Sequence, residues 1–518
     1  MVVDATATPA QVKPRAKHVP YWLLLAGVLL AVAMLARAPG LTGILFDRDE
    51  AHVAVEAQAL ARGEQLYTDI IDRKPPLVPA AVAGVFTLSG SDELWAVRFA
   101  LALWVAATGA VVAGIVRHRG GSRRAAAIAG VLAVLGTVAF LPGDGQASNF
   151  ELWGALPAAA AVLVALAANP RRAQENDGWA DRSPEEPAPA AGDQKTPARL
   201  WASAGAGALV VVAASCKQPY LMTIVPVAYL AWRAPHRLAR LGAVAGGCAL
   251  AAGVIVAGFG TEQMRWAWFD TNDYLSGGQV VHGVVVLAPV MTLLFVATQA
   301  PTVYLAFRAV IGGWRDQAVI LLWLLAVLVA VAAGFRFLGH YYQQALAPLC
   351  VLAGAGVERV SERTGRVAVG VAAGIAAVAI GVALLPVSDQ REPVADSVDY
   401  VEANTATDEP ILVWGAFPEV YWKSGRPLAG GFIHHGFLTG FWAGGSTQDE
   451  DVYNERWEKF LADLRADPPA LVVDSSATNV GEFERYPIAG SPLETFLDDE
   501  GYTRVGVFDG MPIWRRPT

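Results

Sequence analysis

Long apolar blocks alternate with short polar segments between Tyr21 and Leu385. An apolar run of about 18 residues or more can cross a bilayer as an α-helix, and the pattern predicts about eleven such spans. They are expected near Tyr21–Ala36, Trp95–Val116, Ala125–Leu141, Leu152–Ala168, Leu200–Ser215, Pro219–Trp232, Leu241–Gly258, Val281–Ala306, Ala318–Gly334, Gln344–Gly356 and Val367–Leu385. Because no small-residue cleavage site leads from the first span into a soluble chain, we expect that span to be retained.

Composition supports a membrane protein and argues against a soluble protein, a nucleic-acid-binding protein and a disulfide-linked protein. Hydrophobic residues make up 54% of the 518 residues and charged residues only 17%, whereas soluble proteins carry about 25% charged residues. The formal net charge of -8 gives no general attraction for nucleic-acid phosphates, so we expect no nucleic-acid partner. An odd count of three cysteines, all in or beside apolar blocks, argues against a disulfide framework.

Basic residues predict the orientation of the spans. If the N-terminus is cytoplasmic, the inner ends of the spans carry the arginine clusters Arg117, Arg119, Arg123 and Arg124; Arg171 and Arg172; Arg233, Arg237 and Arg240; Arg308 and Arg315; Arg359, Arg363 and Arg366. Most opposite loops carry one Lys or Arg, or none, in agreement with the positive-inside rule. The exception is the first outer loop, whose cations need another explanation.

The same pattern divides the chain into three parts: a cytoplasmic tail (1–19), a transmembrane domain (20–386) and an extracytoplasmic α/β domain (387–518). Residues 169–199 are rich in Pro, Glu, Asp and Ala, which predicts a flexible cytoplasmic loop. In the last part, short apolar strands alternate with helices. The strands are expected at Ile411–Trp414, Ala470–Val473 and Arg504–Val507, and the helices at Val394–Asn404, Glu455–Ala466 and Leu493–Asp499. The predicted fold class is a mainly α membrane protein with this added domain.

The first outer loop combines carboxylates with cations. Asp49 to Ala61 predicts an amphipathic helix that ends at Gly63. An Arg-Lys-Pro-Pro segment begins at Arg73. Val78–Leu88 is too short to span comfortably, so we expect it to lie in the membrane interface or to re-enter.

These motifs resemble the GT-C membrane glycosyltransferases, and among them the protein O-mannosyltransferases and the aminoarabinose transferase of lipid A. The resemblance rests on Asp-Glu-Ala at Asp49, Gly-x-x-x-Tyr-x-Asp from Gly63, Lys-Pro-Pro-Leu at Lys74 and Ala-Val-Arg ending at Arg98. It continues through Ala147–Glu151, Lys217–Pro219 and Arg336–Tyr342, and covers roughly residues 20 to 385.

The resemblance implies a plasma-membrane enzyme that moves a sugar from a polyprenyl-phosphate carrier to a hydroxyl acceptor on the outer face, with inversion. Asp49 would accept the proton of the attacking hydroxyl, supported by Glu50. The carrier phosphate would be bound by Lys74, Arg73, Arg98, Arg336 and His340. The sugar or acceptor would be oriented by Asp144, Glu151 and Tyr67. The sugar, and the acceptor among protein, glycolipid and wall glycan, stay open.

The same resemblance makes a metal centre doubtful. In the aminoarabinose branch a glutamate that takes part in metal binding precedes Lys-Pro-Pro, whereas this chain has Arg73 there. We therefore predict no metal ligands, while a divalent cation stays open as a cofactor. His52 and Glu56 have the spacing of half a metal site, without a third ligand evident in the sequence. His434 and His435 are isolated along the chain and predict a loop.

Other interpretations compete with this one. Asp49 and Glu50 are also typical of the acidic first turn of a helix. Lys74 and Arg73 are also typical of cations that reach lipid headgroups. Arg336 is also typical of a residue that anchors a helix end at the membrane interface. A transporter or flippase usually has internal repeats and charges near the middle of the membrane, and the sequence has neither pattern. An inactive envelope-binding protein is the third alternative, although both the Asp-Glu pair and Lys-Pro-Pro are present.

Overall fold

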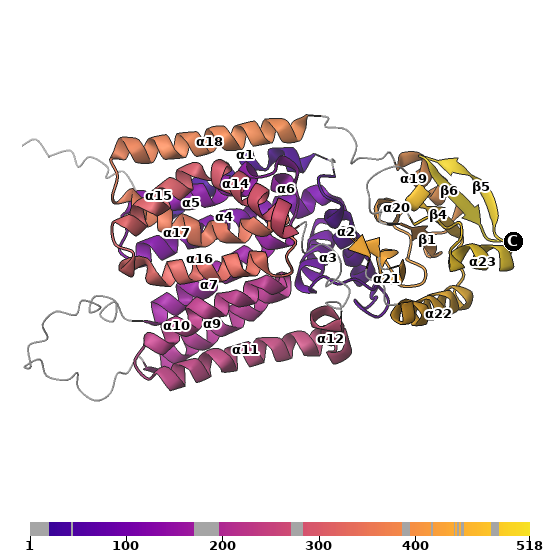
Figure 1. Cartoon of the computed structure of the whole chain (residues 1–518), viewed down its shortest axis with the longest axis horizontal. Coiled ribbons are helices and arrows are strands. Elements are labelled where there is room, and N and C mark those ends of the chain that lie inside the picture. Colours follow the sequence, from indigo (N-terminus) through magenta and orange to yellow (C-terminus); the bar gives the residue numbers. More distant parts are fainter. Residues whose placement is uncertain are drawn as a thin grey trace, which may run out of the picture.

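A helical bundle and a small α/β domain lie end to end (Figure 1). The computed structural model describes residues 20–42, 45–169, 196–270, 283–385, 394–415, 418–439, 441–442, 445–446, 450–477 and 486–517. The predicted N-terminal tail and most of the predicted cytoplasmic loop lie outside these residues. The end of that loop, from Thr196, already belongs to a helix.

Each predicted span contains a helix of the bundle. These helices are α1 (Tyr21–Ala36), α4 (Leu94–His118), α5 (Arg123–Ala139), α7 (Phe150–Ala168), α9 (Thr196–Cys216), α10 (Ile224–Arg233), α11 (Arg237–Phe259), α14 (Ala288–Thr298), α15 (Ala300–Ile311), α16 (Ala318–Ala332), α17 (Leu346–Val357) and α18 (Glu362–Leu384). Within the described residues, six helices are long and apolar enough to cross a membrane, or seven if the bent pair α14–α15 is one span. The chain is thus a multi-pass membrane protein, but the count of eleven is not confirmed.

The predicted span Val281–Ala306 is not one straight helix. Helices α14 and α15 meet at an angle of 86°. Gln299 at the break is buried, and its side-chain amide donates a hydrogen bond to the carbonyl of Gly136, 3.1 Å away. Pro301 follows in the first turn of α15 and has no N–H to continue the helix. The side chain at the break thus links this helix pair to α5.

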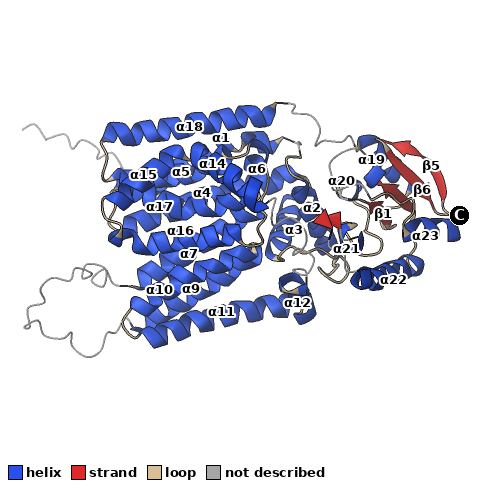
Figure 2. Cartoon of the chain, in the orientation of Figure 1, coloured by secondary structure: helices blue, strands red, loops and turns tan. Residues whose placement is uncertain are grey.

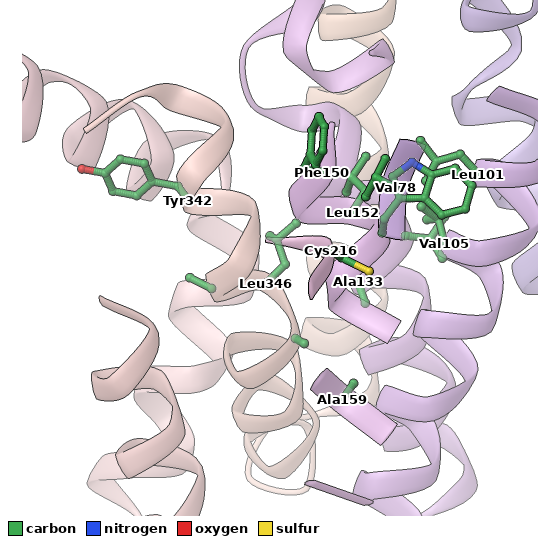
Figure 3. Close-up of a cluster of buried hydrophobic side chains, with 14 of the residues drawn as sticks. Val78, Leu101, Val105, Ala133, Phe150, Leu152, Ala159, Cys216, Tyr342 and Leu346 are labelled. Carbon is green, nitrogen blue, oxygen red and sulfur yellow. The ribbon is translucent and has the colours of Figure 1, made fainter. Parts of the chain in front are cut away.

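The bundle packs through small residues. A Cβ at Gly207 of α9 would lie 2.1 Å from the carbonyl oxygen of Val244, and one at Gly247 of α11 would lie 1.9 Å from that of Ala204, so only glycine allows this approach. One buried hydrophobic cluster links α4, α5, α7, α9 and α17 (Figure 3); it includes Leu101, Val105, Ala133, Leu152, Cys216 and Leu346. This packing fixes the helix ends that carry polar side chains.

Shorter elements gather at the end of the bundle that faces the α/β domain (Figure 1). They include η1 (Ala38–Leu41), α2 (Arg48–Arg62), α3 (Leu77–Ser89), α6 (Pro142–Gln146), α12 (Thr261–Trp268) and η6 (Gly339–Ala345). Three further short elements are η2 (Gln218–Thr223), η4 (Gly283–Leu287) and η5 (Arg315–Gln317). Helices α2 and α3 were predicted. The Asp47 side chain caps α2 by accepting from the N–H of Asp49, and Gly63 ends it with φ 90°.

The C-terminal part is the predicted α/β domain (Figure 2). Its sheet has the order β1 (Ile411–Trp414), β4 (Leu471–Asp474), β6 (Met511–Arg515), β5 (Thr503–Phe508), with β1 and β4 parallel and the other pairs antiparallel. Around it lie α19 (Ala395–Asn404), α20 (Glu419–Ser424), α21 (Gly436–Thr439), α22 (Glu450–Ala466), α23 (Pro492–Asp499), η7 (Ser475–Ala477) and the pair β2 (Phe441–Trp442) and β3 (Gly445–Ser446). The predicted strands and helices are all present, and β6 was not predicted.

This domain is docked on the loop region between α1 and α4. The N–H of Ile71 donates to the carbonyl of Gly431 at 2.7 Å. The Trp422 indole donates to the carbonyl of Asp92 at 2.9 Å, and Lys423 pairs with Glu93 at 3.0 Å. The loop is thus held between the bundle and the α/β domain.

Candidate active site

Asp49 and Lys74 meet at the end of the bundle that faces the α/β domain. Asp49 lies in the first turn of α2, and Lys74 lies in the loop before α3. The Lys74 ammonium is 3.0 Å from the Asp49 carboxylate and 3.8 Å from that of Asp72. The Asp49 side chain is 40% exposed and that of Lys74 is 11% exposed, so this pair is open to a ligand. Tyr67, predicted to bind sugar or acceptor, donates its hydroxyl to the main-chain carbonyl of Lys74, which holds the loop.

The charges around Asp49 favour its ionised form. Although burial raises the pKa of Asp49, the charges of Lys74 and Arg73 outweigh burial and hold that pKa well below its usual value. Lys74 also has a raised pKa: burial lowers it, and the carboxylates of Asp49 and Asp72 more than compensate. In the free protein this carboxylate is therefore ionised and tightly paired, which makes it a weak base.

Glu50 and Arg98, also predicted for the site, form a different kind of pair. Both side chains are buried, and the guanidinium contacts the two carboxylate oxygens at 2.8 and 2.5 Å. Arg98 also donates to the carbonyl of Gly40, and Glu50 accepts the N–H of Ser148 at 2.7 Å. This pair ties α2 to α4 and to the loop before α7, so it belongs to the scaffold of the site.

Phe150, the first residue of α7, contacts two lysines. Its ring centre is 5.5 Å from the ammonium of Lys74 and 5.6 Å from that of Lys217. Lys217 pairs with the buried Glu151 at 3.2 Å and lies over the ring of Tyr341 at 5.0 Å. Lys217 was part of a motif but not of the predicted site. The sequence feature that could have identified Lys217 was its position at a break between two apolar blocks.

Arg73 and Arg336, both predicted to bind phosphate, are half-buried. Burial lowers the pKa of Arg336, and the positive charge of Arg73 lowers it further. Two cations that act on each other in this way are typical of a site that receives an anion.

Asp47, Asp144 and His340 form a cluster that the sequence did not predict as a unit. Their ligand-type atoms lie within 4.8 Å of one another, and among the described residues this is the group of His, Cys, Asp and Glu that could hold a metal ion. His340 contacts Asp144 at 3.4 Å. Burial lowers the pKa of His340, but Glu151 and Asp144 outweigh burial and raise it to about 10. The imidazole is therefore a cation unless a metal ion replaces its proton. One imidazole and two carboxylates fit a divalent cation.

Another group of polar side chains, which includes Glu56, His52 and His434, lies where α2 meets the α/β domain. Glu56 is buried beside Asp72, and burial together with the Asp72 charge raises the pKa of Glu56 well above its usual value. Burial and the charge of Lys74 lower the pKa of His52 to about 4. The ring centres of His52 and His434 are 6.1 Å apart. The α/β domain thus contributes a side chain, from the segment that the sequence predicted only as a loop.

The fold is similar to those of known membrane enzymes. No protein-family model and no curated protein sequence matches the chain significantly. The structure of ArnT from Cupriavidus metallidurans bound to undecaprenyl phosphate gives a TM-score of 0.59 at 14% identity, over 95% of this chain and 97% of that chain. The Archaeoglobus fulgidus oligosaccharyltransferase in the apo form gives 0.54 at 11% identity, over 88% of this chain and 69% of that chain. The resemblance to the GT-C glycosyltransferases is therefore confirmed for the fold.

Proposed function

We propose that the chain is a membrane glycosyltransferase that moves a sugar from a polyprenyl-phosphate carrier to a hydroxyl acceptor. The observation that carries this proposal is the contact between Asp49 and Lys74 at 3.0 Å, which joins a base to a phosphate-binding cation. The ArnT structure of the same fold holds undecaprenyl phosphate, which supports a carrier of this class. We place the site on the outer face of the plasma membrane.

The reaction is a single displacement. The acceptor oxygen attacks the anomeric carbon opposite the carrier, its bond to carbon forms, and the bond from carbon to the phosphate oxygen breaks. The hydroxyl proton goes to Asp49, and the carrier leaves as a phosphate monoester that needs no general acid. Attack from the opposite side inverts the anomeric centre.

Lys74 links carrier binding to the strength of the base. In the free protein it holds the pKa of Asp49 well below its usual value. A phosphate bound to Lys74 places a negative charge beside the pair, and this charge raises the pKa of Asp49. The carboxylate then becomes a better proton acceptor only when the donor is in place.

The remaining polar residues fall into two sets. We assign the carrier phosphate to Lys74, Arg73, Arg336 and His340, and add Lys217 because it contacts the same Phe150 ring as Lys74. Arg98 is fully buried against Glu50, so we do not carry it into the phosphate site. Asp144, Glu151 and Tyr67 stay candidates for orienting the sugar or acceptor, and Asp144 and Glu151 also hold cations.

Asp47, Asp144 and His340 are the residues that would hold a divalent cation. Such an ion would supply positive charge near the leaving phosphate. The proton transfer to Asp49 and the contacts of Lys74 do not depend on it.

The test uses purified protein in lipid nanodiscs, offered a panel of labelled polyprenyl-phosphate sugars together with peptide, glycolipid and glycan acceptors. Transfer from one donor, lost in Asp49→Asn, would support the proposal and identify the sugar. Folded wild-type protein that neither transfers nor hydrolyses any donor in the panel would contradict it.

A further inference from the structure

Two histidines face each other across the boundary between the bundle and the α/β domain. His52 lies on α2 three residues after Asp49, and therefore on the same side of the helix. His434 lies just before α21 in the α/β domain, and its ring centre is 6.1 Å from that of His52. His434 is half-buried and His52 is buried, so solvent reaches the pair from the side of His434.

The backbone around His434 is fixed against the active-site loop. Ile71 donates its N–H to Gly431 at 2.7 Å and forms a β-bridge with Phe432. Gly430 has φ 72°, and a Cβ there would lie 2.4 Å from the ring of Phe460, so glycine is required at this turn. The segment that carries His434 is therefore built to approach the loop that carries Lys74.

Hydrogen bonds to the backbone fix which nitrogen of each ring carries the proton. Nδ1 of His52 is 3.1 Å from the carbonyl of Arg48, which can only accept, so this nitrogen carries the proton and Nε2 accepts. Nδ1 of His434 accepts the N–H of Gly436 at 2.8 Å, so the proton is on Nε2, which donates. The two rings thus offer opposite hydrogen-bonding groups.

Both rings are neutral. Burial lowers the pKa of His52 to about 4 and that of His434 well below its usual value, and the charge of Lys74 acts on both in the same direction. A neutral donor beside a neutral acceptor suits a hydroxyl group, which can donate and accept at once. It suits a phosphate poorly, because phosphate oxygens only accept hydrogen bonds and are bound by donors and cations.

We propose that His52 and His434 form a hydroxyl-binding subsite of the active centre, shared between the two domains. The inference rests on the proposed function and deepens it, because the subsite would bind a hydroxyl of the transferred sugar or of the acceptor beside Asp49. The α/β domain then takes part in substrate recognition through its own side chain.

The test measures transfer and donor hydrolysis in full-length His52→Phe and His434→Phe, which keep ring size and lose the polar nitrogens. We expect a roughly three- to tenfold fall in kcat/KM for transfer, the loss of one neutral hydrogen bond, with unchanged binding of polyprenyl phosphate. His434→Gln, whose amide can donate near the position of Nε2, should restore most of the activity. A higher KM for the acceptor with normal donor hydrolysis identifies the acceptor hydroxyl, and a higher KM for the donor in both reactions identifies the sugar.

Lys423→Ala is the matched control for domain docking, because it removes the ion pair with Glu93 elsewhere on the same boundary. Wild-type transfer is expected in this variant. A His434→Phe enzyme as active as wild type, or no less active than Lys423→Ala, would overturn the subsite while leaving the proposed function intact. Loss of transfer in His434→Phe without rescue by His434→Gln, accompanied by a lower unfolding temperature, would also overturn it and assign the ring to packing. An inactive wild-type protein would overturn both proposals.

Discussion

Asp49 and Glu50 are neighbours in sequence, yet their ion pairs differ. Glu50 and Arg98 are sealed from solvent, with side-chain exposures of 1% and 0%, and further hydrogen bonds from Ser148 and to Gly40 complete the pair. Asp49 is 40% exposed, and its partner Lys74 also contacts Asp72. A saturated pair can only hold elements together, whereas an open pair with additional cations nearby can exchange partners with a substrate.

The largest expected effect on stability comes from breaking the sealed pair. Arg98→Met leaves the Glu50 carboxylate buried without its cation, at a cost of about 3–5 kcal/mol. We expect a large drop in the thermal unfolding temperature in detergent, or loss of folded protein. Arg124→Met, at a half-buried arginine near the other end of the bundle, is the control. A stable Arg98→Met protein would show that the sealed pair is not a scaffold.

The open pair should respond in the opposite way. Lys74→Ala is expected to weaken binding of polyprenyl phosphate by roughly 10- to 100-fold, the loss of one charge-assisted hydrogen bond, with little change in unfolding temperature. Binding of a labelled carrier to protein in nanodiscs measures this. An unchanged affinity for the carrier would remove Lys74 from the phosphate site.

An effect of moderate size is expected on the acid side of the pH profile of transfer. Transfer needs ionised Asp49, so its rate rises with pH through the pKa of that group. Lys74 holds this pKa low in the free protein, and the residual activity of Lys74→Met should therefore require a higher pH than that of wild type. The profile of kcat/KM between about pH 4 and 8 reports the free enzyme. A shift toward lower pH would contradict the proposed coupling.

A smaller, conditional effect is expected from metal removal. If Asp47, Asp144 and His340 hold a divalent cation, a chelator should reduce transfer and added Mn²⁺ or Mg²⁺ should restore it. Asp47→Asn, which changes a ligand without removing the contact between His340 and Asp144, should abolish this response. A chelator effect that persists unchanged in the variant would place the ion elsewhere.

The sequence predicted features that depend on local pattern. Apolar blocks located the helices, because length and hydropathy are properties of one segment. They missed the break at Gln299, whose partner is the carbonyl of Gly136 in a distant helix. The strand β6 escaped prediction because its five residues, Met511–Arg515, carry little pattern of their own and are defined by pairing with β4 and β5.

In the candidate site, too, the sequence predicted contacts within one segment but not those between distant segments. Asp49 and Lys74 were named from a single loop and lie in contact. Burial of Arg98 could not be anticipated, because an arginine near the start of an apolar helix is equally compatible with a ligand-binding or a structural position. Two further features could not be predicted, because each joins residues that are distant in sequence. These are the cluster of Asp47, Asp144 and His340 and the contact between His434 and His52. The spacing of these residues along the chain does not indicate that they meet.

The most direct test of the central claim compares Asp49→Asn with wild type in the same nanodisc preparation. Carrier binding and single-turnover transfer are measured on both, with the donor and acceptor identified by the panel. The account predicts a roughly 10²- to 10⁴-fold slower transfer, the contribution of a general base, while the carrier binds at least as tightly because Lys74 has lost its competing partner. Equal transfer rates in the two proteins would contradict the assignment of Asp49 as the base.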